Sequence, residues 1–224
     1  MNARIIGLFS GFPEHHFNDV HEKVLRDNLP KRDSIVFISA DPENLAQNDD
    51  DRDGMHEMFA ERGLGFTHKH VIDRRTEAEE AVRLVREADC IWLMGGESKW
   101  QIELIRDLKL DVELHKSHAM ILGVSAGSMN LGRVVAYVWD KPEFYEAIGL
   151  TNITIKAHFE EGEWFVPILL EMSKIHPIVA MEDMSAIFIK GDDIWKIGNM
   201  YLFDKGELRP ITDENQINTS TART

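Results

Sequence analysis

The sequence predicts an α/β fold with a mainly parallel sheet, helices on both faces and an antiparallel meander near the C-terminal end. Over the first 132 residues, short apolar runs alternate with longer segments of helical pattern, an order that favours parallel strands joined by helices. Residues 5–9 (IIGLF) and 119–124 (AMILGV) are apolar throughout, as strands buried on both faces require. Closely spaced strand patterns occupy the last part of the chain.

The elements of the first part follow one another in a regular order. Strands are expected at residues 5–9, 35–39, 66–72, 90–94 and 119–124, and each ends at a turn or at small residues. Helices are expected between them at 16–28, 43–62, 75–88 and 98–116.

The rhythm changes after residue 132. Strands are expected at 134–139 and 153–156, and a helix at 163–174. Three further strands, at 185–190, 193–197 and 201–203, are separated by the hairpin-type pairs Gly191-Asp192 and Gly198-Asn199. These three strands predict the antiparallel meander.

The length and composition predict a single domain. A chain of 224 residues with 43% hydrophobic residues can form one large core, and no linker divides it. We expect a domain over residues 1–211, followed by a polar, disordered tail over 212–224. The net charge of −14 makes nucleic acid and anionic membrane surfaces poor partners.

The single cysteine, Cys90, excludes an internal disulfide framework and a cysteine-based zinc site. Its isolation fits a reducing compartment. No apolar run approaches the roughly 18 residues that a membrane span needs. We therefore expect a cytoplasmic protein, as a monomer or a homodimer.

The strongest local motif is Gly-Val-Ser-Ala-Gly at residues 123–127, a match to the nucleophile elbow G-x-S-x-G. In such an elbow the serine stands at the apex of a tight strand-to-helix turn, and the glycines leave room for that backbone. Ser125 is then a candidate nucleophile, and the amide of Ala126 faces the oxyanion. The alternative is a glycine-rich turn that binds an anion at the start of a helix.

A serine nucleophile needs a base and an acid that orients the base. His158 follows the expected strand at 153–156 and lies in a loop, which suits a general base; the other histidines favour structural or surface roles. Glu182 and Asp183 both end an apolar run, so either can be the orienting acid. Gly95-Gly96 follows the fourth strand and can turn a second backbone amide toward the oxyanion.

Four segments together resemble one known family. They are GGESKWQIEL at 95–104, GVSAGSMNLG at 123–132, the loop around His158 and MEDMSAIFI at 181–189. Their order is similar to that of the dipeptidase E-like serine peptidases (peptidase family S51), relatives of α-aspartyl dipeptidase and cyanophycinase. The resemblance covers roughly residues 3–205. It implies the three-layer, flavodoxin-like fold of the class I glutamine amidotransferases.

The resemblance also assigns roles to the matching residues. Ser125 matches the nucleophile, His158 the base, and Asp183, with Glu182 as its neighbour, the acidic member of a triad. Gly96 and Ala126 match the backbone oxyanion donors. The implied activity is hydrolysis of small peptides through an acyl-enzyme, without a metal or an organic cofactor.

Three positions depart from the family pattern. Gly-Gly-Glu-Ser replaces the usual Gly-Gly-Asn or Gly-Gly-Asp, so that Glu97 places a carboxylate near the site. Met184 stands where the family often has glycine, and the loop SGFPEHHF after the first strand matches no pattern. These departures weaken the expectation of Asp-X specificity, for which Arg133 or Lys156 would have to supply a local positive charge.

Two rival functions remain. The first is a non-catalytic or stress-related ligand-binding module on the same fold, with the elbow kept for structure. The second is calcium binding at residues 49–54 (DDDRDG), which match the opening of a calcium loop. The twelfth position of that loop is Ala60 rather than glutamate, so the ligand set is incomplete.

Overall fold

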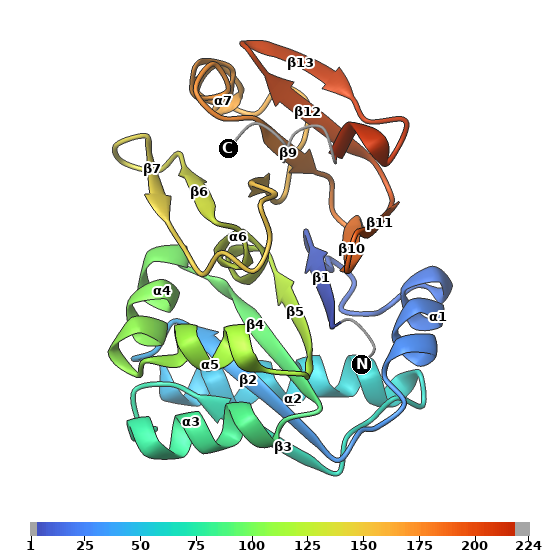
Figure 1. Ribbon diagram of the computed structural model, residues 1–224, viewed down its shortest axis with the longest axis vertical. Coiled ribbons are helices and arrows are strands. Elements are labelled where there is room, and N and C mark those ends of the chain that lie inside the picture. The colour runs from blue at the N-terminus through green and yellow to red at the C-terminus, as the bar shows by residue number, and fades with distance from the viewer. Residues whose placement is uncertain (1–3, 218–224) are drawn as a thin grey trace.

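A seven-stranded sheet runs through the centre of the protein in the order β11-β10-β1-β5-β4-β2-β3 (Figure 1). The computed structural model describes residues 4–217. Five neighbouring strands are parallel, namely β1, β5, β4, β2 and β3. Strands β10 and β11 add an antiparallel hairpin at one edge. The strands are β1 (Ile5–Phe9), β2 (Ser34–Ala40), β3 (His68–Ile72), β4 (Cys90–Gly96), β5 (Met120–Val124), β10 (Ala186–Lys190) and β11 (Asp193–Ile197).

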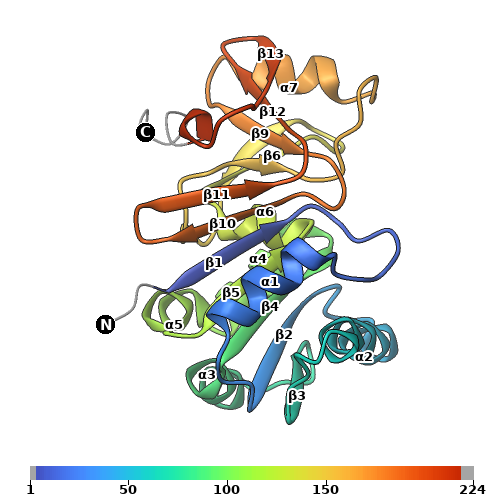
Figure 2. The ribbon, with the colours of Figure 1, turned by 90° about the vertical axis from the view of Figure 1, so that its right-hand side faces the viewer.

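Helices cover both faces of this sheet, as predicted. Alternate side chains of β1 belong to two different apolar clusters: Leu8 packs in the cluster of α3, α4, α5 and α6, and Phe9 in that of α1 and α2. Figure 2 shows α2 and α3 on opposite sides of the sheet. The helices are α1 (Asp19–Asn28), α2 (Leu45–Glu61), α3 (Ala78–Glu87), α4 (Ser98–Asp107), α5 (Leu110–Lys116) and α6 (Ala126–Leu131).

The expected helix over residues 98–116 is divided in two. Helix α4 ends at Asp107, and Lys109 adopts a φ of 56° before α5 begins at Leu110. A left-handed residue cannot continue a right-handed helix, so the chain turns here. Leu110 and Leu114 are consequently buried against the same core as α4.

The C-terminal strands are antiparallel, but they do not form one continuous meander. Strands β10 and β11 join the main sheet, whereas β12 (Met200–Asp204) pairs with β9 (Ile178–Met181) and β13 (Glu207–Pro210) in a second sheet. The chain leaves the first sheet at Gly198, whose φ is +79°. Strand β8 (Ile155–Lys156) completes the second sheet, parallel to β9.

Two further elements flank the second sheet, which lies above the main sheet in Figure 1. Strands β6 (Val134–Tyr137) and β7 (Glu143–Glu146) form a separate hairpin, and helix α7 (Val166–Met172) packs in a third apolar cluster. β7 and β13 are additions to the strands expected from the sequence, and β9 forms on the apolar run that Glu182 and Asp183 end.

The predicted tail over 212–224 falls partly outside the described residues. Within the described part, Ile217 is fully buried and packs in the cluster of α3 to α6. Residues 218–224 lie outside it. Among residues 4–217, no helix is both long enough and apolar enough to cross a membrane.

The topology brings several segments that are distant in the chain to one edge of the main sheet. The carboxyl ends of β1, β4 and β5 meet there because these strands are parallel. Strand β10 is antiparallel to β1 and pairs Ala186 with Phe9, so the residues that precede β10 reach the same edge. The second sheet adds the loop that follows β8, which brings His158 to the candidate site.

Candidate active site

Ser125 occupies the sharp turn between β5 and α6 with φ 51° and ψ −116°. Few residues other than glycine adopt such angles, and they cluster at functional sites. The backbone N–H of Ser125 donates to the carbonyl oxygens of Phe9 and Ser10, at 3.0 Å each. A Cβ at Gly127 would collide with the backbone of Leu93, and a Cβ at Gly123 would lie 2.6 Å from the backbone of Gly127. The glycines of the motif therefore allow the start of α6 to pack directly on the sheet.

His158 lies between Ser125 and an acidic side chain. Its Nε2 is 2.9 Å from Oγ of Ser125, and its Nδ1 is 2.7 Å from Oδ1 of Asp183. With the proton on Nδ1, the ring donates to Asp183 and accepts from the serine hydroxyl. The imidazole is half exposed, so a substrate can reach it. The arrangement has the contacts of a serine hydrolase triad.

Glu182, the other candidate acid, points elsewhere. Its carboxylate accepts hydrogen bonds from Nδ2 of Asn199 and from the hydroxyl of Tyr201, both at 2.9 Å. The two acids are adjacent in the chain, yet the structure brings only Asp183 to the imidazole. Glu182 instead ties the end of β9 to β12, and its hydrogen bond raises the pKa of Tyr201.

Ser10 is a polar residue of this site that the sequence analysis did not identify. Its side chain is fully buried; Oγ accepts the backbone N–H of His158 at 2.7 Å and donates to the carbonyl of Met181 at 2.9 Å. The same oxygen lies 3.4 Å from Oδ1 of Asp183. One hydroxyl thus joins the end of β1 to both segments that carry the base and the acid. Ser10 could have been identified from the sequence, because it directly follows a strand that was expected to be parallel and to end at this edge of the sheet.

Gly11 allows these groups to approach one another. A Cβ on Gly11 would collide with the imidazole of His158 and the carboxylate of Asp183. The loop SGFPEHHF, which begins at Ser10, matched no family pattern, yet its first two residues contact or make room for the imidazole of His158.

Of the expected oxyanion residues, Ala126 follows Ser125 directly, Gly95 lies beside it, and Gly96 lines the same cleft. Ala126 is the first residue of α6, where backbone N–H groups have no acceptor within the helix. Gly96 has a φ of +136°, and a Cβ on Gly95 would lie only 3.5 Å from that of Ser125. Glu97 serves another purpose, because its carboxylate caps α4 by accepting the N–H of Lys99 at 3.0 Å.

A cleft of about 430 Å³ opens beside Ser125 and His158. Gly95 and Gly96 line one part of it, and residues of α2 line another. The described lining residues include no lysine or arginine. Lys156, a candidate for local positive charge, is buried, and its Nζ donates to the carbonyl of Ala157 at 2.9 Å. Burial lowers the pKa of Lys156 to about 8.

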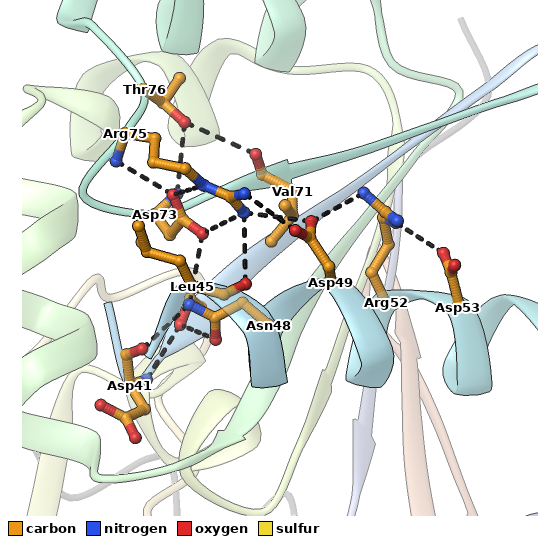
Figure 3. Close-up of polar contacts among 11 residues, drawn as sticks. Asp41, Leu45, Asn48, Asp49, Arg52, Asp53, Val71, Asp73, Arg75 and Thr76 are labelled. Atoms are coloured by element: carbon orange, nitrogen blue, oxygen red, sulfur yellow. Dashed lines mark hydrogen bonds and ion pairs between the residues drawn. The ribbon is translucent and has the colours of Figure 1, made fainter. Parts of the chain in front are cut away.

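The structure contradicts the calcium-loop alternative. Residues 49–54 lie within the helix α2 rather than in a loop. Figure 3 shows that two of their carboxylates have cationic partners: Asp49 binds Arg75 at 2.8 Å, and Asp53 binds Arg52 at 2.7 Å. Arg52 lowers the pKa of Asp53 to about 2. Within residues 4–217, no group of three or more His, Cys, Asp or Glu side chains is placed to hold a metal ion.

Comparisons with known proteins relate the chain to one family and to two solved structures. The sequence profile of peptidase family S51 matches residues 8–197. A solved peptidase from an acI-B1 Actinobacterium is 19% identical, with a TM-score of 0.75 over 94% of this chain and 95% of the other. A candidate peptidase E protein from Listeria monocytogenes EGD-e is 17% identical, with a TM-score of 0.66 over 88% of this chain and 98% of the other. No curated protein sequence matches the chain.

Proposed function

Because this chain belongs to peptidase family S51 and is a serine-type peptidase, we propose that it hydrolyses small peptides through a triad of Ser125, His158 and Asp183. The observation that carries the proposal is the continuous chain of contacts from Oγ of Ser125 through the imidazole to Asp183, at 2.9 and 2.7 Å. The cleft volume of about 430 Å³ supports a small substrate, since it falls in the range of small-molecule sites.

The first half of the reaction forms an acyl-enzyme. Oγ of Ser125 attacks the carbonyl carbon of the scissile amide, and Nε2 of His158 takes the hydroxyl proton. Asp183 holds the proton on Nδ1 and stabilises the imidazolium that forms. The C–N bond then breaks, and His158 gives its proton to the departing amine.

The second half restores the enzyme. Water attacks the acyl carbon while His158 takes one of its protons; the C–Oγ bond then breaks, and Ser125 recovers its proton. In both halves, the backbone amides of Gly96 and Ala126 stabilise the oxyanion. One such donor contributes about 3–4 kcal/mol in a characterised serine protease.

A fluorophosphonate probe tests the nucleophile directly. We expect covalent labelling of wild-type protein at Ser125, mapped by mass spectrometry, and no labelling of Ser125→Ala. We also expect Ser125→Ala to lower kcat for peptide hydrolysis by about 10⁶-fold. Circular dichroism of the variant controls for folding. Full activity of folded Ser125→Ala would overturn the proposal, and a folded wild-type protein that neither labels nor hydrolyses peptides would favour the binding-module alternative.

A further inference from the structure

Helix α2 contributes Met55 and Met58 to one side of the cleft, and helical spacing explains why they lie there together. Asp51, Gly54, Met55 and Met58 recur at intervals of three and four residues, so they share one face of α2, and all of them line the cleft. Asp49 instead pairs with Arg75, which follows β3, and Asp53 pairs with Arg52 of the same helix, as Figure 3 shows. The paired acids of α2 are therefore separated from the residues that border Ser125.

The most buried side chains that line this cleft are uncharged. Met58, Trp92 and Val124 contribute to the lining and are 4%, 0% and 7% exposed. Phe12 and Met55 add apolar surface nearer to solvent. An ionised side chain placed against such a surface loses hydration without gaining a partner. An apolar side chain gains free energy there because its surface leaves water.

The charged groups at the cleft also oppose an acidic side chain. Asp50 and Asp51 both belong to the lining, and Asp50 is exposed without an ion-pair partner among the described residues. His15 and His158 are the other titratable groups of the lining. A carboxylate on the substrate would therefore meet two like charges and no lysine or arginine.

We propose that this cleft binds the side chain on the acyl side of the scissile bond, and that it selects uncharged apolar side chains and excludes acidic ones. The inference rests on the proposed function, because it takes Ser125 as the nucleophile and Gly96 as an oxyanion donor, and both border the cleft. The expected substrates are therefore peptides with a residue such as leucine, methionine or phenylalanine directly before the cleaved bond.

Gly54 offers a selective way to test the cleft. A Cβ on Gly54 would have no heavy atom within 4 Å, so a side chain there enters open space. Replacement of a mid-helix glycine also removes an entropic penalty, so Gly54→Leu is expected to fold. Ala46→Leu is the matched control, because Ala46 is exposed on the same helix and does not line the cleft.

The experiment compares kcat/KM for dipeptides with Leu, Met, Phe, Ala, Asp or Glu first and a constant second residue. We expect Leu, Met and Phe to exceed Asp and Glu by at least about tenfold in the wild-type enzyme. Gly54→Leu should lower kcat/KM for Phe and Leu by about tenfold and for Ala by less. Ala46→Leu should match wild type.

Fluorophosphonate labelling separates the two ways in which this test can fail. If Ser125 labels but Asp or Glu dipeptides are preferred, or Gly54→Leu affects all substrates equally, the specificity inference is wrong and the peptidase proposal stands. If the folded protein neither labels nor cleaves any dipeptide, both are overturned.

Discussion

The backbone N–H of His158 donates a hydrogen bond of 2.7 Å to the buried hydroxyl of Ser10. The two residues are 148 positions apart, and they join the end of β1 to the loop that follows β8. His158 has a φ of 54°, a conformation that non-glycine residues rarely adopt and that surrounding contacts must hold. We therefore expect Ser10 to act as a positioning residue for the imidazole.

Ser10→Ala should lower kcat by about tenfold to a hundredfold with little change in KM, because the imidazole loses its backbone anchor. Steady-state kinetics with a cleaved peptide measure this. Ser173→Ala is the matched control, because the Ser173 hydroxyl makes the same two kinds of hydrogen bond. It accepts the backbone N–H of Gly206 at 3.0 Å and donates to the carbonyl oxygen of Leu170 at 2.8 Å. We expect a comparable stability loss of about 1–3 kcal/mol in both variants but reduced turnover only in Ser10→Ala. Equal kinetics in both would reject the positioning role.

Gly11→Ala should displace the imidazole or the carboxylate of Asp183, since the added methyl group collides with both. We expect a large loss of kcat in a protein that still unfolds cooperatively. Gly65→Ala serves as the control because its Cβ would make only ordinary contacts, at 3.5 Å from Ala60. Retention of wild-type turnover in Gly11→Ala would show that the site adopts another arrangement during catalysis.

Replacement of each of the two adjacent acids by its amide should have very different effects on kcat. Asp183→Asn should lower kcat by about 10⁴-fold, because an amide can hold the imidazole in the wrong tautomer. Glu182→Gln keeps hydrogen-bonding capacity toward Asn199 and Tyr201, so we expect less than about a threefold change. Measurement of kcat for both variants decides the assignment. A larger effect at Glu182 would identify it as the orienting acid.

His21 should make the protein sensitive to acid. The side chain is fully buried, its ring lies 5.5 Å from that of Phe9 and 5.8 Å from that of Phe12, and burial lowers its pKa from 6.5 to about 4. Because the folded-state pKa lies below the unfolded-state value, the stabilisation is complete above pH 6.5 and is lost as the pH falls toward 4. The difference between the two pKa values of His21 corresponds to about 3 kcal/mol in the free energy of unfolding.

Denaturant unfolding between pH 7 and pH 4 measures the effect of His21. The free energy of unfolding of His21→Leu should fall less over this range than that of wild type. His68→Gln, at an exposed position, should keep the wild-type pH dependence. If His21→Leu and wild type lose stability in parallel, the histidine does not titrate as stated.

Local signals were sufficient for much of this protein. The alternation of apolar runs and helical patterns predicted the parallel sheet and its two helical layers, because burial on both faces requires fully apolar strands. The Gly-Val-Ser-Ala-Gly motif indicated a strained turn at Ser125, because its glycines are needed within two residues of the serine. His158 was a candidate base because it follows the strand expected at residues 153–156.

Tertiary structure decided what depends on residues far apart in the chain. Glu182 and Asp183 have the same charge and neighbouring positions, and only the pairing of β9 with β12 turns one toward Tyr201 and leaves the other beside His158. The C-terminal strands divided between two sheets for a similar reason, since hairpin signals specify a turn but not the strand that will pair next. The anchoring of His158 by Ser10 has no local pattern, because one hydrogen bond across 148 positions exists only once both sheets have packed.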